Sequence, residues 1–238
     1  MVVLGSVPPE PLQLLPYYLT DRSPLLRAGM VLSADGAATS DGSSRPLSGP
    51  ADRAVFRLLR ALSDVVLVGA GTARSEDYGP VPLPRPLLHW RRDAGLPERP
   101  RLAVVTATGA LDPASRLFSG DLPTLVLAPR AVAGRCRDAL PRAEVVDTGP
   151  GDLAHGLAAL RERGLCSVLC EGGPHLLGDL VRAGLVDELC ATVSPLLAGA
   201  GERLVAGALD APAPLVLQHA LESAGELLLR YSLGRPAC

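Results

Sequence analysis

Hydrophobic positions along the chain alternate between short extended runs and segments with helical spacing. Residues 65–68 are uniformly apolar, which is typical of a strand buried on both faces of a sheet. Between residues 51 and 62 the apolar positions recur at helical spacing, and Pro50 stands where the first turn of a helix tolerates proline. This part of the chain therefore predicts an amphipathic helix followed by a buried strand.

The same pattern predicts an α/β fold for the rest of the chain. Further strands are predicted at residues 25–32, 102–106, 124–127, 145–146, 165–170, 186–193, 214–219 and 226–231, and further helices near 131–140, 152–163 and 175–183. The proline-rich stretch 78–100 predicts a long irregular excursion. Strands that alternate with helices imply a mixed, mostly parallel central sheet flanked by helices, and the last two strands add an antiparallel C-terminal hairpin.

One domain accounts for most of the pattern. The 238 residues suit one large domain or two small ones. Residues 1–24 contain several prolines and look like an ordered N-terminal lead-in segment. We therefore expect this lead-in to be followed by a single domain over residues 25–238.

Composition narrows the possible functions. All 23 basic residues are arginines, because the sequence contains no lysine, and this excludes a P-loop lysine or a Schiff-base lysine. The net charge is −2 and the arginines are scattered, which argues against a nucleic-acid-binding surface. No apolar run approaches the ~20 residues that cross a bilayer, and no secretory signal is visible, so we expect no membrane contact and a cytoplasmic location.

Cysteine and histidine are not arranged as metal ligands. The five cysteines are an odd number without disulfide-dense spacing, and the four histidines are dispersed. We expect buried structural thiols and no metal site.

A glycine-rich turn directly follows the apolar run 65–68. Gly69, Ala70, Gly71 and Thr72 would open a helix there, where glycines let the backbone approach a phosphate and the helix N-terminus offers unpaired N–H groups. The dinucleotide fingerprint G-x-G-x-x-G is incomplete, because Arg74 stands in place of the third glycine. The alternative is a glycine-assisted turn without a ligand.

A second glycine turn follows the strand predicted at residues 165–170. Gly172 and Gly173 precede Pro174, which suits the first helical position, and Leu176 begins the buried stripe of the helix. Two such turns at the carboxyl ends of parallel strands can hold one dinucleotide across the crevice of the sheet. We therefore predict that both turns bind a single dinucleotide cofactor.

Four polar residues near these turns are candidates for chemistry. Glu171 would face the same crevice, although it could instead bind the N–H groups of its own turn. For Asp35 and Asp52 the alternatives are formation of a turn and stabilisation of a helix dipole. Thr106 follows a strand with hydroxyls and no negative charge, which suits the 2′-phosphate of NADPH better than the free ribose of NADH.

Four motifs, in order, resemble the pyrimidine reductase family of riboflavin biosynthesis. They are SADG at 33–36, DVVLVGAGTAR at 64–74, EGGP at 171–174 and GLVDEL at 184–189. The resemblance implies the dihydrofolate reductase-like fold, NADPH bound by the two glycine turns, and a homodimer. Because zinc deaminase motifs are missing, the chain looks most similar to the stand-alone branch of the family.

The resemblance also implies a reaction, which is reduction of a C=N bond. Members of the family convert the ribosylamino group of a diaminopyrimidine or aminouracil phosphate to a ribitylamino group. By this resemblance Asp35 and Glu171 would bind the substrate and assist proton delivery. The remaining expected substrate-binding residues are Ser33, Asp52, Arg60 for the phosphate, and Asp77.

The chain departs from the family pattern in two places, and these departures leave alternatives open. Ala37 replaces a usual lysine, and residues 76–80 read EDYGP where the family usually has Asp-Asp-Pro. One alternative is reduction of dihydrofolate, in which Asp52 would be the carboxylate near the pterin ring. Another is a catalytically silent protein that binds the nucleotide only.

Overall fold

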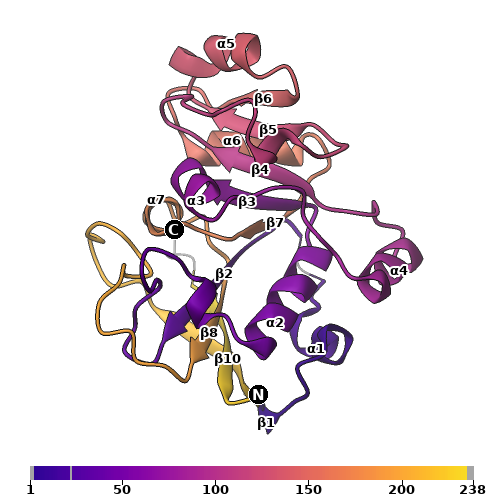
Figure 1. Cartoon of the computed structure of the whole chain (residues 1–238), viewed down its shortest axis with the longest axis vertical. Coiled ribbons are helices and arrows are strands. Elements are labelled where there is room, and N and C mark those ends of the chain that lie inside the picture. The colour runs from indigo at the N-terminus through magenta and orange to yellow at the C-terminus, as the bar shows by residue number, and fades with distance from the viewer. Residues whose placement is uncertain (1–2, 22, 235–238) are drawn as a thin grey trace.

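A single ten-stranded sheet organises the computed structural model, which describes residues 3–21 and 23–234 (Figure 1). The strand order is β1-β9-β10-β8-β2-β7-β3-β4-β5-β6. The strands are β1 (Val3–Ser6), β2 (Leu25–Ser33), β3 (Val65–Gly69), β4 (Arg101–Val105), β5 (Thr124–Ala128), β6 (Ala143–Asp147), β7 (Ser167–Cys170), β8 (Glu188–Ser194), β9 (Leu215–Ser223) and β10 (Glu226–Leu233).

The predicted fold class is confirmed. Strands from β8 through β6 in this order pair in parallel, and β10 pairs antiparallel with both β8 and β9. The C-terminal hairpin is not the outermost part of the sheet, however, because β1 pairs with β9 in parallel and forms that edge.

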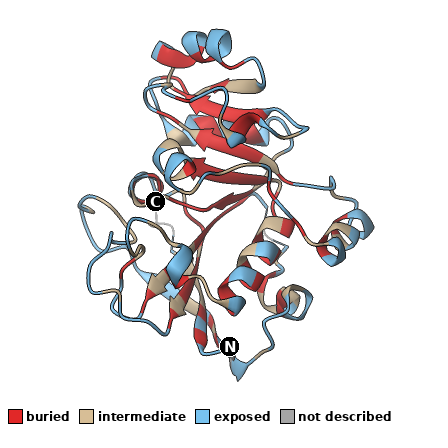
Figure 2. Ribbon diagram, viewed as in Figure 1, coloured by how far each residue is buried: buried red, intermediate tan, exposed pale blue. Residues whose placement is uncertain are grey.

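Helices cover both faces of the sheet. They are α1 (Pro11–Tyr18), α2 (Pro50–Ala61), α3 (Ala70–Ser75), α4 (Arg85–Asp93), α5 (Arg130–Ala139), α6 (Leu153–Arg161) and α7 (Pro174–Arg182). Alternate residues of β3 enter two different cores: Val66 and Val68 pack with α1 and α2, whereas Val65 and Leu67 pack with α6 and α7. The central strands are therefore buried on both sides, as Figure 2 shows.

The expectation of an irregular excursion over residues 78–100 is wrong, because α4 lies within it. The prolines at 84 and 86 stand before and inside the first turn, where a missing N–H costs no helical hydrogen bond. Leu87 is fully buried in the core, and the buried Arg91 binds the carbonyls of Ala61 and Ser63 at 2.7 and 2.8 Å. The many prolines favoured an irregular segment, so the helical spacing of Leu87 and Arg91 was not recognised as a helix.

The described part of the predicted lead-in is joined closely to the rest of the molecule. Strand β1 pairs with β9, and α1 packs on α2. Leu14 and Tyr18 of α1 are buried in the core, and the carbonyl of Tyr18 accepts a hydrogen bond from Arg27 at 3.0 Å. The boundary at residue 24 stays a prediction.

The topology brings three connections to one edge of the sheet. Because β2, β7 and β3 are adjacent and parallel, the segments after residues 33, 170 and 69 leave the sheet at the same end. In the described ranges no helix is long and apolar enough to span a bilayer.

Candidate active site

The two glycine turns lie against each other. The backbone N–H of Gly69 donates to the carbonyl of Gly172 at 2.8 Å. A Cβ atom added to Gly69 would lie 3.6 Å from the nitrogen of Gly173. Helix α3 begins directly after the first turn and α7 directly after the second. The fold therefore brings together the two glycine turns that the sequence predicted to lie at one site.

Of the glycines in the two turns, Gly71 leaves the backbone most open to a ligand. Gly172 has φ +92°, a left-handed conformation that side chains disfavour, and a Cβ there would lie 3.6 Å from the side chain of Met30. At Gly173 a Cβ would overlap the hydroxyl of Thr72, whereas Gly71 has nothing within 4 Å. The first N–H groups of α7 have no partner inside the helix and carry the positive end of its dipole. The turns thus form a cradle suited to an anion.

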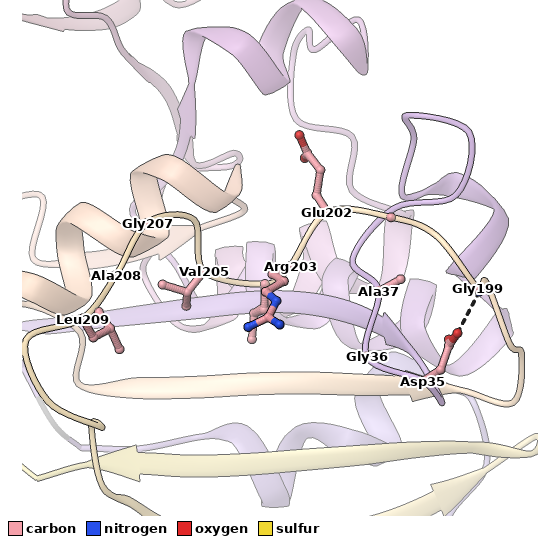
Figure 3. A pocket seen from close by; sticks show the side chains of 12 residues that line it. Asp35, Gly36, Ala37, Gly199, Glu202, Arg203, Val205, Gly207, Ala208 and Leu209 are labelled. Atoms are coloured by element: carbon pink, nitrogen blue, oxygen red, sulfur yellow. Dashed lines mark hydrogen bonds between the residues drawn. The ribbon is translucent and has the colours of Figure 1, made fainter.

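An open cavity of about 800 Å³ is lined by a segment that packs against α7 (Figure 3). Its walls are residues 35–37 and the connection between β8 and β9 over residues 199–209. The N–H of Ala206 donates to the carbonyl of Pro174 at 3.0 Å, so this connection contacts the second glycine turn's helix. The glycine turns themselves do not line the cavity.

Arg203 projects into this cavity, and sequence reasoning missed it (Figure 3). The residue is exposed, and its guanidinium has no hydrogen-bond or ion-pair partner within the described ranges. Nothing in the local sequence distinguishes it from the other arginines. Only its position in the cavity identifies it as a group that can bind an anion.

Asp35 fixes one wall of the cavity. Its carboxylate accepts hydrogen bonds from the Ser33 hydroxyl at 2.5 Å and from the N–H groups of Ala198 and Gly199 at 3.0 and 2.7 Å. These bonds, the Ser33 bond first, lower the pKa of Asp35 to about 2. The expected proton-delivering role is therefore not supported, because such a carboxyl is ionised at neutral pH.

Ser33 does not have the expected substrate-binding position. Its side chain is buried, donates to Asp35 and accepts a hydrogen bond from the N–H of Ala37 at 2.9 Å. The hydroxyl is therefore used to hold the turn after β2.

Glu171 and Arg60 bind each other instead of facing the crevice. Arg60 donates from Nε and Nη2 to the two carboxylate oxygens of Glu171 at 2.6 and 2.7 Å, and the Tyr78 hydroxyl adds a bond of 2.8 Å. The Glu171 side chain is fully buried. The expected roles of Glu171 in proton delivery and of Arg60 in phosphate binding therefore need correction. Side chains alternate between the two faces along β7, and Glu171, the next residue, continues this alternation and points toward α2.

Two further expected site residues are occupied elsewhere. Asp77 lies on the surface, where its carboxylate pairs with Arg116 at 2.9 Å, so a substrate role is not supported. Thr106 is buried and its hydroxyl accepts a hydrogen bond from the N–H of Gly109 at 3.0 Å. The Thr106 hydroxyl therefore stabilises the turn after β4 instead of offering itself to a phosphate.

Positive charge reaches the turn after β4 from two arginines. Arg74 of α3 donates to the carbonyl of Ala110 at 3.2 Å, and Arg135 of α5 donates to that of Thr108 at 3.5 Å. Both arginines are exposed, so each guanidinium keeps donors free for an anion.

Asp52 is the expected site residue whose surroundings favour a bound proton. Burial raises its pKa to about 6, against the opposing effect of the hydroxyls of Ser48 and Thr192, and the negative charge of Glu226 raises it further. Its Oδ2 accepts a hydrogen bond from Ser48, and Oδ1 has no hydrogen-bond partner in the described parts of the chain. Thr192 lies on β8 opposite residue 31 of β2, near the edge of the sheet where the glycine turns meet.

Comparisons with known proteins agree with this architecture. Residues 24–226 match a family model described as the RibD C-terminal domain. The chain is 32% identical over 179 residues to the 2,5-diamino-6-ribosylamino-4(3H)-pyrimidinone 5′-phosphate reductase of Methanothermobacter thermautotrophicus, which covers 74% of this chain and 78% of that protein. It is 32% identical over 169 residues to the riboflavin biosynthesis protein RibD of Mycobacterium tuberculosis, which covers 70% of this chain and 41% of that longer protein.

A solved structure is similar along nearly the whole chain. The crystal structure of a pyrimidine reductase-like protein from Corynebacterium diphtheriae has a TM-score of 0.78 and 31% sequence identity. The match covers 90% of this chain and 93% of that one.

Proposed function

Because the chain belongs to the RibD C-terminal domain family of pyrimidine reductases, we propose that it is an NADPH-dependent reductase of a C=N bond. The proposed substrate is 5-amino-6-(5-phosphoribosylamino)uracil or the equivalent diaminopyrimidine, whose ribosylamino group becomes a ribitylamino group. The observation that carries the proposal is the 2.8 Å contact between Gly69 and Gly172, which joins the two glycine turns into one cradle. The archaeal relative is a reductase of a phosphorylated ribosylaminopyrimidinone, which supports a substrate of this class.

The cradle fits a dinucleotide. The turn at residues 69–72 would hold one side of the pyrophosphate, and Gly172, Gly173 and the start of α7 at Pro174 would hold the other. Leu176 is almost completely buried beside them and supports the helix start. When bound, the nicotinamide ring supplies a hydride.

The charge around the cradle favours NADPH over NADH. Arg74 and Arg135 flank the turn after β4, one strand away from the first glycine turn. An additional phosphate on the adenosine ribose would add a charge-assisted hydrogen bond to an arginine there. We therefore propose that Arg74 and Arg135, and not Thr106, make the protein prefer NADPH to NADH.

We propose that Arg203 binds a phosphate common to both nicotinamide cofactors. The segment that carries it contacts the start of α7 through Ala206 and Pro174. A guanidinium without a partner in the described chain can bind such a phosphate through charge-assisted hydrogen bonds.

Reduction of a C=N bond also needs a proton for the nitrogen. Asp52 is suited to provide it, because its pKa of about 6 leaves about a tenth of the carboxyl protonated at pH 7 and more in mild acid. Asp35, with its pKa near 2, instead holds residues 198–199 against the turn after β2 and keeps the cavity in shape.

The same observation favours a second candidate function, reduction of dihydrofolate. A buried carboxyl that holds its proton would serve a pterin ring equally well. A third candidate, a silent nucleotide-binding protein, has the cradle but reduces neither acceptor.

One assay distinguishes the three candidates. Oxidation of NADPH is followed by absorbance with the ribosylamino-uracil phosphate, with its diaminopyrimidine equivalent and with dihydrofolate. We expect rapid oxidation with one of the two pyrimidines. Faster oxidation with dihydrofolate would favour the second function, and cofactor binding without oxidation would favour the third.

We further propose that the protein forms a homodimer and acts in the cytoplasm. Strand β9 exposes Leu215 and Val216, 42% and 57% accessible, and the neighbouring β10 exposes Leu227 at 47%. Leu215 pairs with residue 233 at one end of the hairpin and Leu227 with Glu222 at the other, so these side chains form no single patch, and the dimer is proposed from the resemblance to the family. Light scattering of the purified protein would measure its mass directly.

A further inference from the structure

The start of α2 is capped by a carboxylate from the far end of the chain. Glu226, the first residue of β10, accepts hydrogen bonds from the N–H groups of Gly49, Ala51 and Asp52 at 3.1, 2.8 and 3.3 Å. Its side chain is buried, with 1% of the residue accessible. Gly49 is glycine for lack of space, because a Cβ there would overlap the Glu226 carboxylate.

This cap removes the usual partners of a carboxylate in the first turn of a helix. Such a group normally gains from the free N–H groups and from the helix dipole, and both effects favour its ionised form. In this protein Glu226 takes the N–H groups, including that of Asp52 itself. Asp52 keeps a hydroxyl partner, Ser48, and an Oδ1 without a hydrogen bond in the described chain.

The charged and titratable groups that face Asp52 lie on three elements. Glu226 lies on β10, and its negative charge disfavours ionisation of Asp52. Arg53 of α2 favours ionisation, but its guanidinium is turned toward the carbonyl of Ser48. Tyr18 of α1 is buried nearby, and its pKa is raised well above the usual value by its own burial first, so the phenol is neutral. Two buried carboxyls at one helix start cannot both ionise without a large cost.

We propose that Glu226 is a positioning residue for the reduction: it occupies the N–H groups at the start of α2 and thereby increases the fraction of Asp52 that carries a proton to donate. This inference rests on the proposed function. In the step, the carbon of the C=N bond takes a hydride from the nicotinamide cofactor, which is oxidised. The nitrogen takes the proton from the Asp52 carboxyl as the double bond becomes single, and water then reprotonates the carboxylate.

The first test is the pH profile of kcat for the Glu226→Gln variant. The amide removes the neighbouring negative charge and releases N–H groups to Asp52, so Asp52 ionises at lower pH. We expect the alkaline limb of the profile to move by about one pH unit, which reduces kcat about tenfold at pH 7 and restores it in acid. The KM for NADPH should not change. Glu226→Asp, which keeps the charge, should retain most of the wild-type profile.

A matched control is Glu222→Gln. Glu222 is an exposed carboxylate near the same turn, where it accepts hydrogen bonds from Ser6 and Gly225. This variant should have the wild-type pH profile. A uniform loss of activity in Glu226→Gln at every pH would mean that the cap is merely structural, and it would overturn the inference.

The second test does not need turnover. The carboxyl carbon of Asp52, identified by comparison with Asp52→Asn, is titrated by NMR in wild-type protein and in Glu226→Gln. We expect its midpoint to fall by about one unit in the variant. An unchanged midpoint would overturn the inference alone, whereas wild-type protein that reduces no acceptor would overturn the proposed function and the catalytic role of Asp52 with it.

Discussion

Replacing Asp52 by asparagine should stabilise the protein, although it should also remove the proposed proton donor. Burial is the largest cause that raises the pKa of Asp52 from its ordinary value of 3.8 to about 6. Between these two values the folded chain binds more protons than the unfolded chain, so the free energy of unfolding falls as pH rises through this window. Above about pH 6 the full cost of the buried charge is present.

The size of this cost follows from the pKa difference. Each unit corresponds to about 1.4 kcal/mol, so the ionised carboxylate costs up to about 3 kcal/mol at pH 7. The amide of the substituted asparagine carries no charge and escapes this cost, but it must find acceptors for its two donors in the space near Ser48. We therefore expect a net stabilisation of about 1–3 kcal/mol at pH 7 for Asp52→Asn.

Urea unfolding of both proteins between pH 4 and 8 measures the effect. The difference in unfolding free energy between variant and wild type should grow from pH 4 to about pH 6 and then remain level. A difference that stays constant across this range would refute the reasoning, because it would show that Asp52 titrates alike in the folded and unfolded chains. Loss of NADPH oxidation in the same variant would separately support its proposed role.

Two other sets of substitutions test the cofactor site. Gly173→Ala should raise the KM for NADPH roughly tenfold or more, because the new Cβ displaces the hydroxyl of Thr72, whereas Gly5→Ala on β1, outside the cradle and with nothing within 4 Å of the new Cβ, should have a much smaller effect. Arg74→Gln should raise the KM for NADPH about tenfold and leave the KM for NADH unchanged. Arg203→Gln should raise the KM for both cofactors. The reverse pattern would refute the positions that we assign to the two arginines.

The sequence was sufficient for the fold because each central strand carries its own signal. The apolar run at 65–68 predicted a strand buried on both faces, and the structure buries all four of its residues. Two glycine pairs directly after such strands predicted a shared site, because parallel strands must end at the same edge. Helix α4 escaped prediction, since its signal consists of only Leu87 and Arg91 within a proline-rich stretch.

The partners of the polar side chains could not be predicted in the same way. Glu171 follows a strand and precedes two glycines, and this position is typical of a residue in the crevice. Its side chain nevertheless points to the other face of the sheet, where it binds Arg60, 111 positions earlier. Glu226 carried no signal at all, because its cap on α2 joins positions more than 170 residues apart. Such contacts depend on tertiary packing, which local spacing does not encode.

The environments of three carboxyls explain why one of them is suited to acid chemistry. Asp35 receives three hydrogen bonds and stays ionised, and both carboxylate oxygens of Glu171 accept hydrogen bonds from Arg60. Asp52 accepts a hydrogen bond from the Ser48 hydroxyl, but Glu226 takes the backbone donors at the start of α2 that would otherwise stabilise its charge. The same burial that makes the ionised form of Asp52 costly at neutral pH also raises the fraction of Asp52 that carries a proton, which is why stability and proton donation should change in opposite directions when Asp52 is replaced.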